Sequence, residues 1–175
     1  PPDATERIPW RDLLRHRQTW AFAVGKALTD PIWLFYLFWL PKFLDAKWGV
    51  HLATVAMPLI AIYVVADVGS IAGGWFSSTL VSHGWTVNRS RKTAMLVAAL
   101  LILPTMLAPL AGSLWMAVAI VAVAAAAHQW WSANLFTLVS DMFPRQAVGS
   151  VVGIGGFAGA LSAVVFQRVT GKILD

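Results

Sequence analysis

The chain has 175 residues, of which 58% are hydrophobic and 12% are charged, with a mean hydropathy of +0.69. In a soluble domain about a quarter of the residues are charged, so this composition excludes an ordinary soluble protein and predicts an all-helical integral membrane protein. The formal net charge of +5 does not indicate a nucleic-acid partner, because the basic residues cluster at the ends of apolar segments. The absence of cysteine excludes disulfides and thiol chemistry.

The first 19 residues are polar and basic, and we predict a cytoplasmic linker or a segment at the membrane interface. Trp10, Leu13, Leu14 and Arg17 recur at helical spacing, which favours a short helix lying on the membrane surface. The alternative is a solvated linker. The chain has no initiator Met and ends without a polar tail, so we expect a piece of a longer polypeptide.

Five apolar segments follow, each long enough to cross about 30 Å of hydrocarbon. They are predicted at about residues 20–40, 53–76, 93–110, 114–140 and 148–169. The connections between them, at 41–52, 77–92, 111–113 and 141–147, are short, so neighbouring spans should be antiparallel. The third span is uncharged and contains Pro104 and Pro109, and we expect it at the lipid-facing periphery.

Lys and Arg residues are distributed unevenly between the two ends of these spans. Eight lie on the side of the N-terminus: Arg7, Arg11, Arg15, Arg17, Arg89, Arg91, Lys92 and Arg145. Four lie on the other side: Lys42, Lys47, Arg168 and Lys172. Because cytoplasmic loops carry the excess of Lys and Arg, the N-terminus is predicted to be cytoplasmic.

The first span carries two opposite charges, Lys26 and Asp30, four residues apart and so on one helical face. Asp30 lies about 15 Å along the helix, near the middle of the membrane. One interpretation is an internal ion pair. The other places both residues on the substrate or proton path, since an apolar pair would serve a structural purpose at lower cost. Pro31 follows and can bend the helix, which fits a gate.

Asp67 is the only charge of the second span, and Gly69 and Gly73 follow it at the spacing that permits close helix contact. Asp67 is either a structural partner of a neighbouring helix or a proton carrier and charge partner of Lys26. The fifth span is dense in small residues, which indicates packing. Its Gly155–Gly156 pair is a secondary candidate for a gate.

The fourth span places polar side chains at bilayer depth, where each unpaired polar group is costly. At 100° per residue, one broad face holds His128, Gln129, Trp131 and Ser132, together with Leu135, while Asn134 points toward a different neighbour. Gln129 and Ser132 suit hydroxyl and carboxylate oxygens, and Trp131 suits the apolar face of a sugar ring. His128 can exchange a proton near neutral pH. The structural alternative is an interhelical hydrogen-bond seam.

No nucleotide loop, nucleophile elbow or zinc motif occurs in the sequence, so we predict neither catalytic residues nor a cofactor or metal. Asp30 and Asp67 on adjacent spans could mimic the two carboxylates of an intramembrane aspartyl protease, which is the enzyme alternative. A channel-forming or purely structural membrane protein is the other competing class.

Several stretches resemble one transporter family. They are TDPIWLFYLFWLPKFL at 29–44, ADVGSIAGGW at 66–75, RKTAML at 91–96, AAAAHQWWSANLFTLVSDMFP at 124–144 and AVGSVVGIGGFAGA at 147–160. Together they resemble the C-terminal half of a major facilitator superfamily transporter, in the anion:cation symporter branch and most similar to its hexuronate transporters. The loop from Gly74 to Lys92 resembles the superfamily's cytoplasmic signature, with Ser78 at the position of the signature Asp.

The resemblance implies that residues 20–175 supply five helices of a six-helix C-terminal bundle, and that the N-terminal half of the same transporter is a partner. It implies uptake of a small organic anion, a hexuronate, by proton symport through alternating access across a bacterial inner membrane. An aldonate or an aromatic acid is the alternative substrate. The substrate-binding candidates are Lys26, Asp30, Gln129, Trp131, Ser132 and Asn134. The proton-coupling candidates are Asp30, Asp67 and His128, and the gating candidates are Pro31, Gly155 and Gly156.

Overall fold

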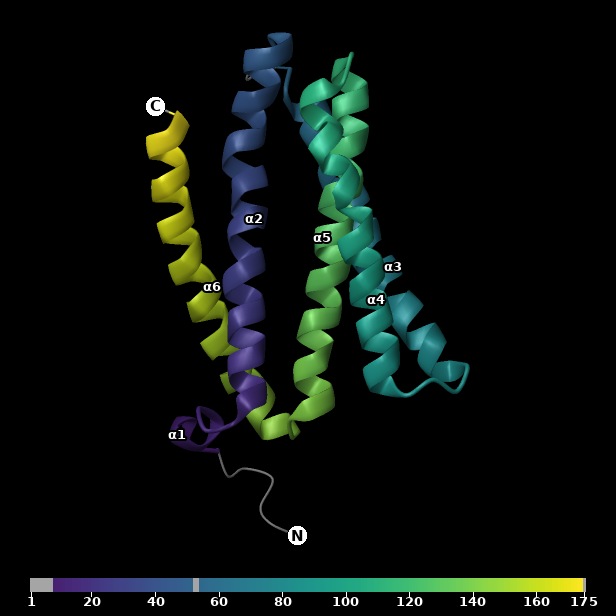
Figure 1. The fold of residues 1–175 in the computed structure, drawn as a ribbon, viewed down its shortest axis with the longest axis vertical. Helices are drawn as coiled ribbons and strands as arrows, with labels where there is room; N and C mark the ends of the chain where they lie inside the picture. The colour runs from purple at the N-terminus through teal and green to yellow at the C-terminus, as the bar shows by residue number, and fades with distance from the viewer. Residues whose placement is uncertain (1–7, 52–53, 175) are drawn as a thin grey trace. The chain divides into compact units, whose positions relative to one another are not determined.

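The computed structural model describes residues 8–51 and 54–174, and within these ranges every regular element is a helix. The helices are α1 (Trp10–Leu13), α2 (Arg17–Trp48), α3 (Ala56–Ser82), α4 (Val87–Leu101), the 3-10 helix η1 (Leu103–Leu110), α5 (Leu114–Met142) and α6 (Arg145–Leu174) (Figure 1). Five helical segments in the described residues are long and apolar enough to cross a membrane, with α4 and η1 counted together. The predicted all-helical membrane fold is confirmed.

The helices extend beyond the predicted spans, so two of the predicted connections are wrong. The sequence predicts a loop at 41–52, but α2 continues through Pro41 to Trp48. Most of the predicted loop 77–92 is also helical, because α3 continues to Ser82 and α4 begins at Val87. Hydropathy marks where the hydrocarbon ends, whereas a helix can continue into the polar layer beyond it. The start predicted for the second span, Ala53, lies outside the described residues.

The helices end where glycine permits a left-handed turn. Gly49 follows α2 with φ 64°, and Gly84 lies between α3 and α4 with φ 86°. Residues with a side chain rarely adopt this conformation, and glycine adopts it readily. Thr86 then caps the start of α4, where its hydroxyl oxygen accepts a hydrogen bond from the backbone N–H of Arg89 at 3.4 Å.

The N-terminal segment forms two helices where the spacing predicted one. α1 ends at Leu13, and Arg17 is already the first residue of α2. The Thr19 hydroxyl donates to the Leu13 carbonyl at 2.7 Å, and the Trp20 indole donates to the Leu14 carbonyl at 2.8 Å. These side chains bind carbonyl groups that a continuing helix would have used, so the chain turns a corner before α2. Residues 1–7, including Arg7, lie outside the described residues.

α4 ends at Leu101, and Pro104 is the second residue of η1, which begins at Leu103. Proline has no backbone N–H and clashes with the preceding turn, so an α-helix is disfavoured there. The chain continues as a 3-10 helix with exposed Leu103, Met106 and Leu110. Of the five spans in the described residues, the one formed by α4 and η1 is the least buried. In its most apolar stretch 17% of the residues are buried, against 44% for α5. This agrees with the lipid-facing position predicted for it.

The chain divides into two compact units, and the first comprises Pro1–Phe35 with Leu135–Asp175. Within it, α6 lies beside the N-terminal part of α2 (Figure 1). The buried face of α6 has a residue at every fourth position: Ala147, Val151, Gly155, Gly159 and Ala163. Small side chains on this face let the backbones approach closely, and a Cβ atom on Gly155 would overlap the Phe22 ring.

The second unit, Tyr36–Asn134, contains a similar contact between α3 and α5. A Cβ atom on Gly69 would lie 2.6 Å from the Cα atom of Ala126, and one on Gly73 would lie 2.8 Å from the Cα atom of Trp130. No side chain fits in either space. The close helix contact predicted for the Gly69–Gly73 pair is therefore confirmed.

Candidate functional site

Lys26 and Asp30 form an ion pair in the first unit. The Lys26 ammonium nitrogen lies 2.8 Å from Asp30 Oδ1, and Lys26 is only 7% exposed. The same nitrogen lies 4.4 Å from the centroid of the Phe136 ring of α5, where the negative face of the ring attracts the cation. The helical spacing placed both residues on one face, and the structure pairs them, as in the first of the two interpretations. Phe136 was missed, because sequence spacing within α2 gives no information about the facing helix.

The Asp30 carboxylate fits against α6 at Gly159. A Cβ atom on Gly159 would overlap Asp30 Oδ2 and would lie 2.9 Å from Asp30 Cγ. The Asp30 side chain is nonetheless 25% exposed, whereas that of Lys26 is 9% exposed. The pair is therefore accessible from the carboxylate side. Pro31, the next residue, is buried, and α2 continues through it without interruption.

This arrangement can exchange one anion for another. A desolvated ammonium group needs an anionic partner, and Asp30 is that partner in the structure. A second carboxylate that reaches Lys26 can replace Asp30, since charge-assisted hydrogen bonds of this kind are similar in geometry and strength. No covalent chemistry is required.

In the second unit, α5 carries several polar side chains within its apolar span. Gln129 and Ser132 are half-buried, and neither has a hydrogen-bond partner among the described residues. The indole nitrogen of Trp131 is buried and likewise has none within this part of the chain. His128, on the same helix face, is buried. A buried or half-buried polar group without a partner favours a ligand or water, so Gln129, Trp131 and Ser132 suit the recognition of hydroxyl groups.

Asn134 lies elsewhere, as its helical angle predicted. It is fully buried, and its side-chain nitrogen donates to the backbone carbonyls of Gly73 at 3.1 Å and Trp130 at 3.0 Å. These bonds join α5 to α3. The observed geometry gives Asn134 a structural part, which differs from the substrate contact that the family resemblance implied.

The remaining predicted residues are not brought together. Asp67 is exposed on α3 and forms no ion pair among the described residues, so its expected structural partner is not found. Gly155 is buried against Phe22, whereas Gly156 is exposed, and a Cβ atom added there would meet no atom within 4 Å. The two glycines therefore differ in environment and do not act as one unit.

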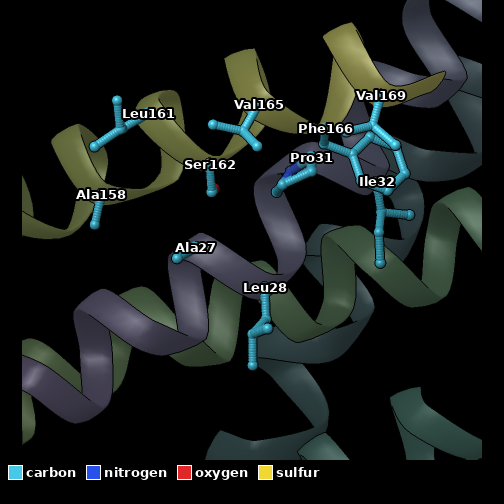
Figure 2. Close-up of a pocket in the computed structure, with 10 residues that line it drawn as sticks. All are labelled: Ala27, Leu28, Pro31, Ile32, Ala158, Leu161, Ser162, Val165, Phe166 and Val169. Atoms are coloured by element: carbon cyan, nitrogen blue, oxygen red, sulfur yellow. The ribbon is translucent and has the colours of Figure 1, made fainter. Parts of the chain in front are cut away.

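A groove of about 780 Å³ lies between α2 and α6 on the side of Pro31 (Figure 2). Its lining is apolar, with Leu28 and Ile32 from α2 and Val165 and Phe166 from α6. The one polar side chain in the lining is that of Ser162, and its hydroxyl already donates to the Gly159 carbonyl at 2.8 Å. This groove suits hydrocarbon and does not suit a sugar acid. The described residues also contain no group of three or more His, Asp or Glu that could hold a metal ion.

Comparison with known proteins places the chain in a family. The sequence matches the Major Facilitator Superfamily over residues 2–167. A hexuronate transporter of Escherichia coli strain K12 is 31% identical over 165 residues, which are 93% of this chain and 38% of the relative. A D-galactonate transporter of Escherichia coli O6:H1 is 26% identical over 165 residues, which are 94% and 38% of the two chains.

A more distant organism also has a relative, the chloroplastic sodium-dependent phosphate transport protein 1 of Arabidopsis thaliana. It is 26% identical over 175 residues, which are 99% of this chain and 34% of the relative. The chain thus spans less than two fifths of the length of these three relatives. The family resemblance seen in the sequence is confirmed. Because the match covers most of the chain and the described residues include five helices able to cross a membrane, this chain belongs to the Major Facilitator Superfamily.

Proposed function

We propose that the chain is the C-terminal half of a secondary active transporter that takes up a hexuronate by proton symport through alternating access. The observation that carries this proposal is the buried Lys26, whose Asp30 partner is the more exposed member of the pair. A buried cation with an exchangeable counter-ion is a suitable site for a substrate carboxylate. The names of the bacterial relatives, which are sugar-acid transporters, agree with this chemistry.

In the first unit, Lys26 is the candidate for the carboxylate of a sugar acid, and in the second unit three α5 side chains are candidates for hydroxyl groups and a sugar ring. Gln129 offers both donors and an acceptor, and Ser132 offers a hydroxyl group, so both suit sugar hydroxyls. The Trp131 ring packs against the apolar face of the sugar. Asn134 is left out of this assignment, because its side chain is bonded to Gly73 and Trp130.

Asp30 is the favoured proton carrier among Asp30, Asp67 and His128. It is the only one of the three for which the structure gives an ion pair with a basic side chain in the described residues. Protonation of Asp30 releases Lys26 for the substrate, and loss of the proton restores the pair after release. Uptake of the anion is thereby linked to uptake of a proton. Pro31 allows α2 to bend beside this pair.

From the excess of Lys and Arg we infer that the N-terminus is cytoplasmic, and we propose a bacterial inner membrane as the location. The described part of residues 1–19, with Trp10, Arg11 and Arg15 all exposed, suits the membrane interface. The partners are the lipid bilayer, the small organic anion, the proton and the N-terminal half of the transporter. No nucleic acid takes part.

Uptake by proteoliposomes tests the function. The full-length protein should accumulate labelled glucuronate or galacturonate when the outside is acidic, and should only equilibrate it without the gradient. Lys26→Ala should abolish accumulation, whereas Lys92→Ala, which removes an exposed lysine of α4, should not. Accumulation that is independent of the gradient would exclude symport, and wild-type uptake by Lys26→Ala would exclude its role.

The alternative substrate is another organic anion, such as an aldonate, which the D-galactonate transporter relative favours. Competition against labelled glucuronate by galactonate and by an aromatic acid ranks these classes. No observation favours the intramembrane protease, because Asp30 is bonded to Lys26 and Asp67 is exposed.

A further inference from the structure

The backbone of α6 closes over the Asp30 carboxylate at Gly159. A Cβ atom on Gly159 would overlap Asp30 Oδ2, and it would lie 2.9 Å from Asp30 Cγ and 3.2 Å from Asp30 Cβ. The carboxylate cannot yield freely, because its other oxygen is held at 2.8 Å by Lys26. Any side chain at position 159 must therefore displace Asp30 from its present place. Glycine leaves Asp30 where it is.

We propose that Gly159 is a positioning residue through which α6 holds the Asp30 carboxylate on the Lys26 ammonium. It thereby sets how strongly Asp30 competes with the substrate anion for Lys26. This inference rests on the proposed function, in which the substrate carboxylate replaces Asp30. It adds a residue that touches neither substrate nor proton, and it makes the strength of the pair depend on the distance between α6 and α2.

The charged groups around the pair are few, so the effect of Gly159 should pass through Asp30 alone. Between residues 146 and 167, α6 has no acidic, basic or other titratable side chain. The part of α5 in this unit contributes Phe136, which contacts Lys26, and one acidic residue, Asp141, which is exposed. Lys26 is the basic partner of Asp30 in the described residues.

Neighbouring glycines of α6 supply matched controls. Gly153 is exposed, and a Cβ atom there would meet no atom within 4 Å, so Gly153→Ala tests the effect of alanine in the helix by itself. Gly155 is buried against Phe22, whose ring packs on Phe136. Gly155→Ala therefore disturbs the packing of α6 on α2 at a site where no Asp30 atom lies within 4 Å. Of the three variants, only Gly159→Ala adds a methyl group against the Asp30 carboxylate.

The experiment measures uptake kinetics of the full-length protein with labelled hexuronate. In Gly159→Ala the displaced Asp30 no longer competes, so the KM should fall about tenfold, the size expected for loss of one charge-assisted hydrogen bond. The kcat should fall as well, because the freed Lys26 releases the anion slowly. Gly155→Ala should lower the amount of active protein at unchanged KM, and Gly153→Ala should resemble the wild type. An unchanged KM in Gly159→Ala, or the same change in Gly155→Ala, would overturn the proposal.

A second measurement removes the carboxylate. In an Asp30→Ala background only the Asp30 Cβ atom, at 3.2 Å, still faces position 159. Adding Gly159→Ala to that background should change neither the Kd for hexuronate nor the thermal unfolding midpoint. An undiminished effect on either quantity would show that Gly159 acts independently of Asp30.

Four proteins separate this inference from the proposed function: the wild type, Gly159→Ala, Asp30→Ala and the double variant. If the wild type binds no sugar acid, the proposed function fails, and the thermal midpoints alone decide the contact. The positioning contact would be supported if Gly159→Ala lowers the thermal midpoint strongly in the wild type and only slightly in the Asp30→Ala background. Equal drops in the two backgrounds would overturn it.

Discussion

The side-chain amide of Asn134 donates a hydrogen bond to the backbone carbonyl of Gly73 at 3.1 Å, which ties α5 to α3. The contact is possible because Gly73 has no side chain. A Cβ atom there would lie 2.6 Å from Cγ and 2.8 Å from Cα of Trp130. One glycine thus serves both as a space for the Trp130 ring and as a hydrogen-bond acceptor for an amide at bilayer depth.

Gly73→Ala should destabilise the protein. The added methyl group overlaps the backbone of Trp130, and overpacking of this kind costs about 1–3 kcal/mol. Gly74→Ala is the matched control, because a Cβ atom on the adjacent glycine meets nothing within 4 Å. The measurement is the thermal unfolding midpoint of the full-length protein in detergent. Equal midpoints for the two variants would contradict the close packing of α3 on α5.

Asn134→Ala should lower the stability of the protein, whereas Ser132→Ala should raise the KM for hexuronate. Asn134 is fully buried and bonded, so its loss should lower stability by about 1 kcal/mol, the typical size of a polar contact between membrane helices. Ser132 has no partner in the described residues, so Ser132→Ala should leave stability unchanged and raise the KM for hexuronate roughly 2–10-fold. Thermal midpoints and uptake kinetics on the same preparations check both. The assignment of Ser132 fails if its variant melts early and transports normally.

Lys26→Met should destabilise the protein more than the double variant Lys26→Met with Asp30→Asn. The single change leaves the Asp30 carboxylate without its cation, whereas the double change removes both charges. Breaking a fully buried pair costs about 3–5 kcal/mol, and a smaller loss is expected here because the Asp30 side chain is 25% exposed. The measurement is the thermal midpoint of the two variants.

An exposed ion pair supplies the control for the comparison of the single and double variants. Arg15 and Asp12 are 3.8 Å apart, with side chains 79% and 54% exposed. Asp12→Asn should leave the midpoint unchanged, since exposed pairs contribute little. A double variant of Lys26 and Asp30 that is no more stable than Lys26→Met alone would argue against a coupled pair.

Ser77→Ala should weaken the connection between α3 and α4. Ser77 is fully buried, and its hydroxyl oxygen accepts a hydrogen bond from the guanidinium group of Arg91 at 2.6 Å. Removing this acceptor leaves a buried charged donor without one of its partners, at a cost of about 1–3 kcal/mol. Ser82→Ala is the control, because Ser82 is exposed and bonded within its own helix turn to Thr79. Matching midpoints for the two serine variants would rule out a stabilising role for the Arg91 contact.

The sequence predicted those features that depend on one helix at a time. Apolar length located the five spans, and the four-residue spacing of Lys26 and Asp30 placed them together. The helical angle of Asn134 separated it from His128. The Gly69–Gly73 spacing predicted that a helix packs closely on α3, but it did not name the residues of the facing helix. Those residues depend on helix register, which decides that Gly159 of α6 faces Asp30 and that Gly156 faces no atom. For the same reason neither Phe136 beside Lys26 nor Arg91 beside Ser77 could be named from spacing.

The end of η1 shows how deep the second unit can lie in the bilayer. The Lys47 ammonium group donates hydrogen bonds to the backbone carbonyls of Pro109 and of Ala111, the latter at 3.3 Å, and lies 4.7 Å from the centroid of the Trp48 ring. An ammonium group and a tryptophan ring are both most stable among lipid headgroups. Since the exposed Leu107 and Leu110 lie just before Ala111, the acyl chains end within about one helical turn of this lysine. We therefore expect the boundary between the hydrocarbon layer and the lipid headgroups to lie near Lys47 on that side of the membrane.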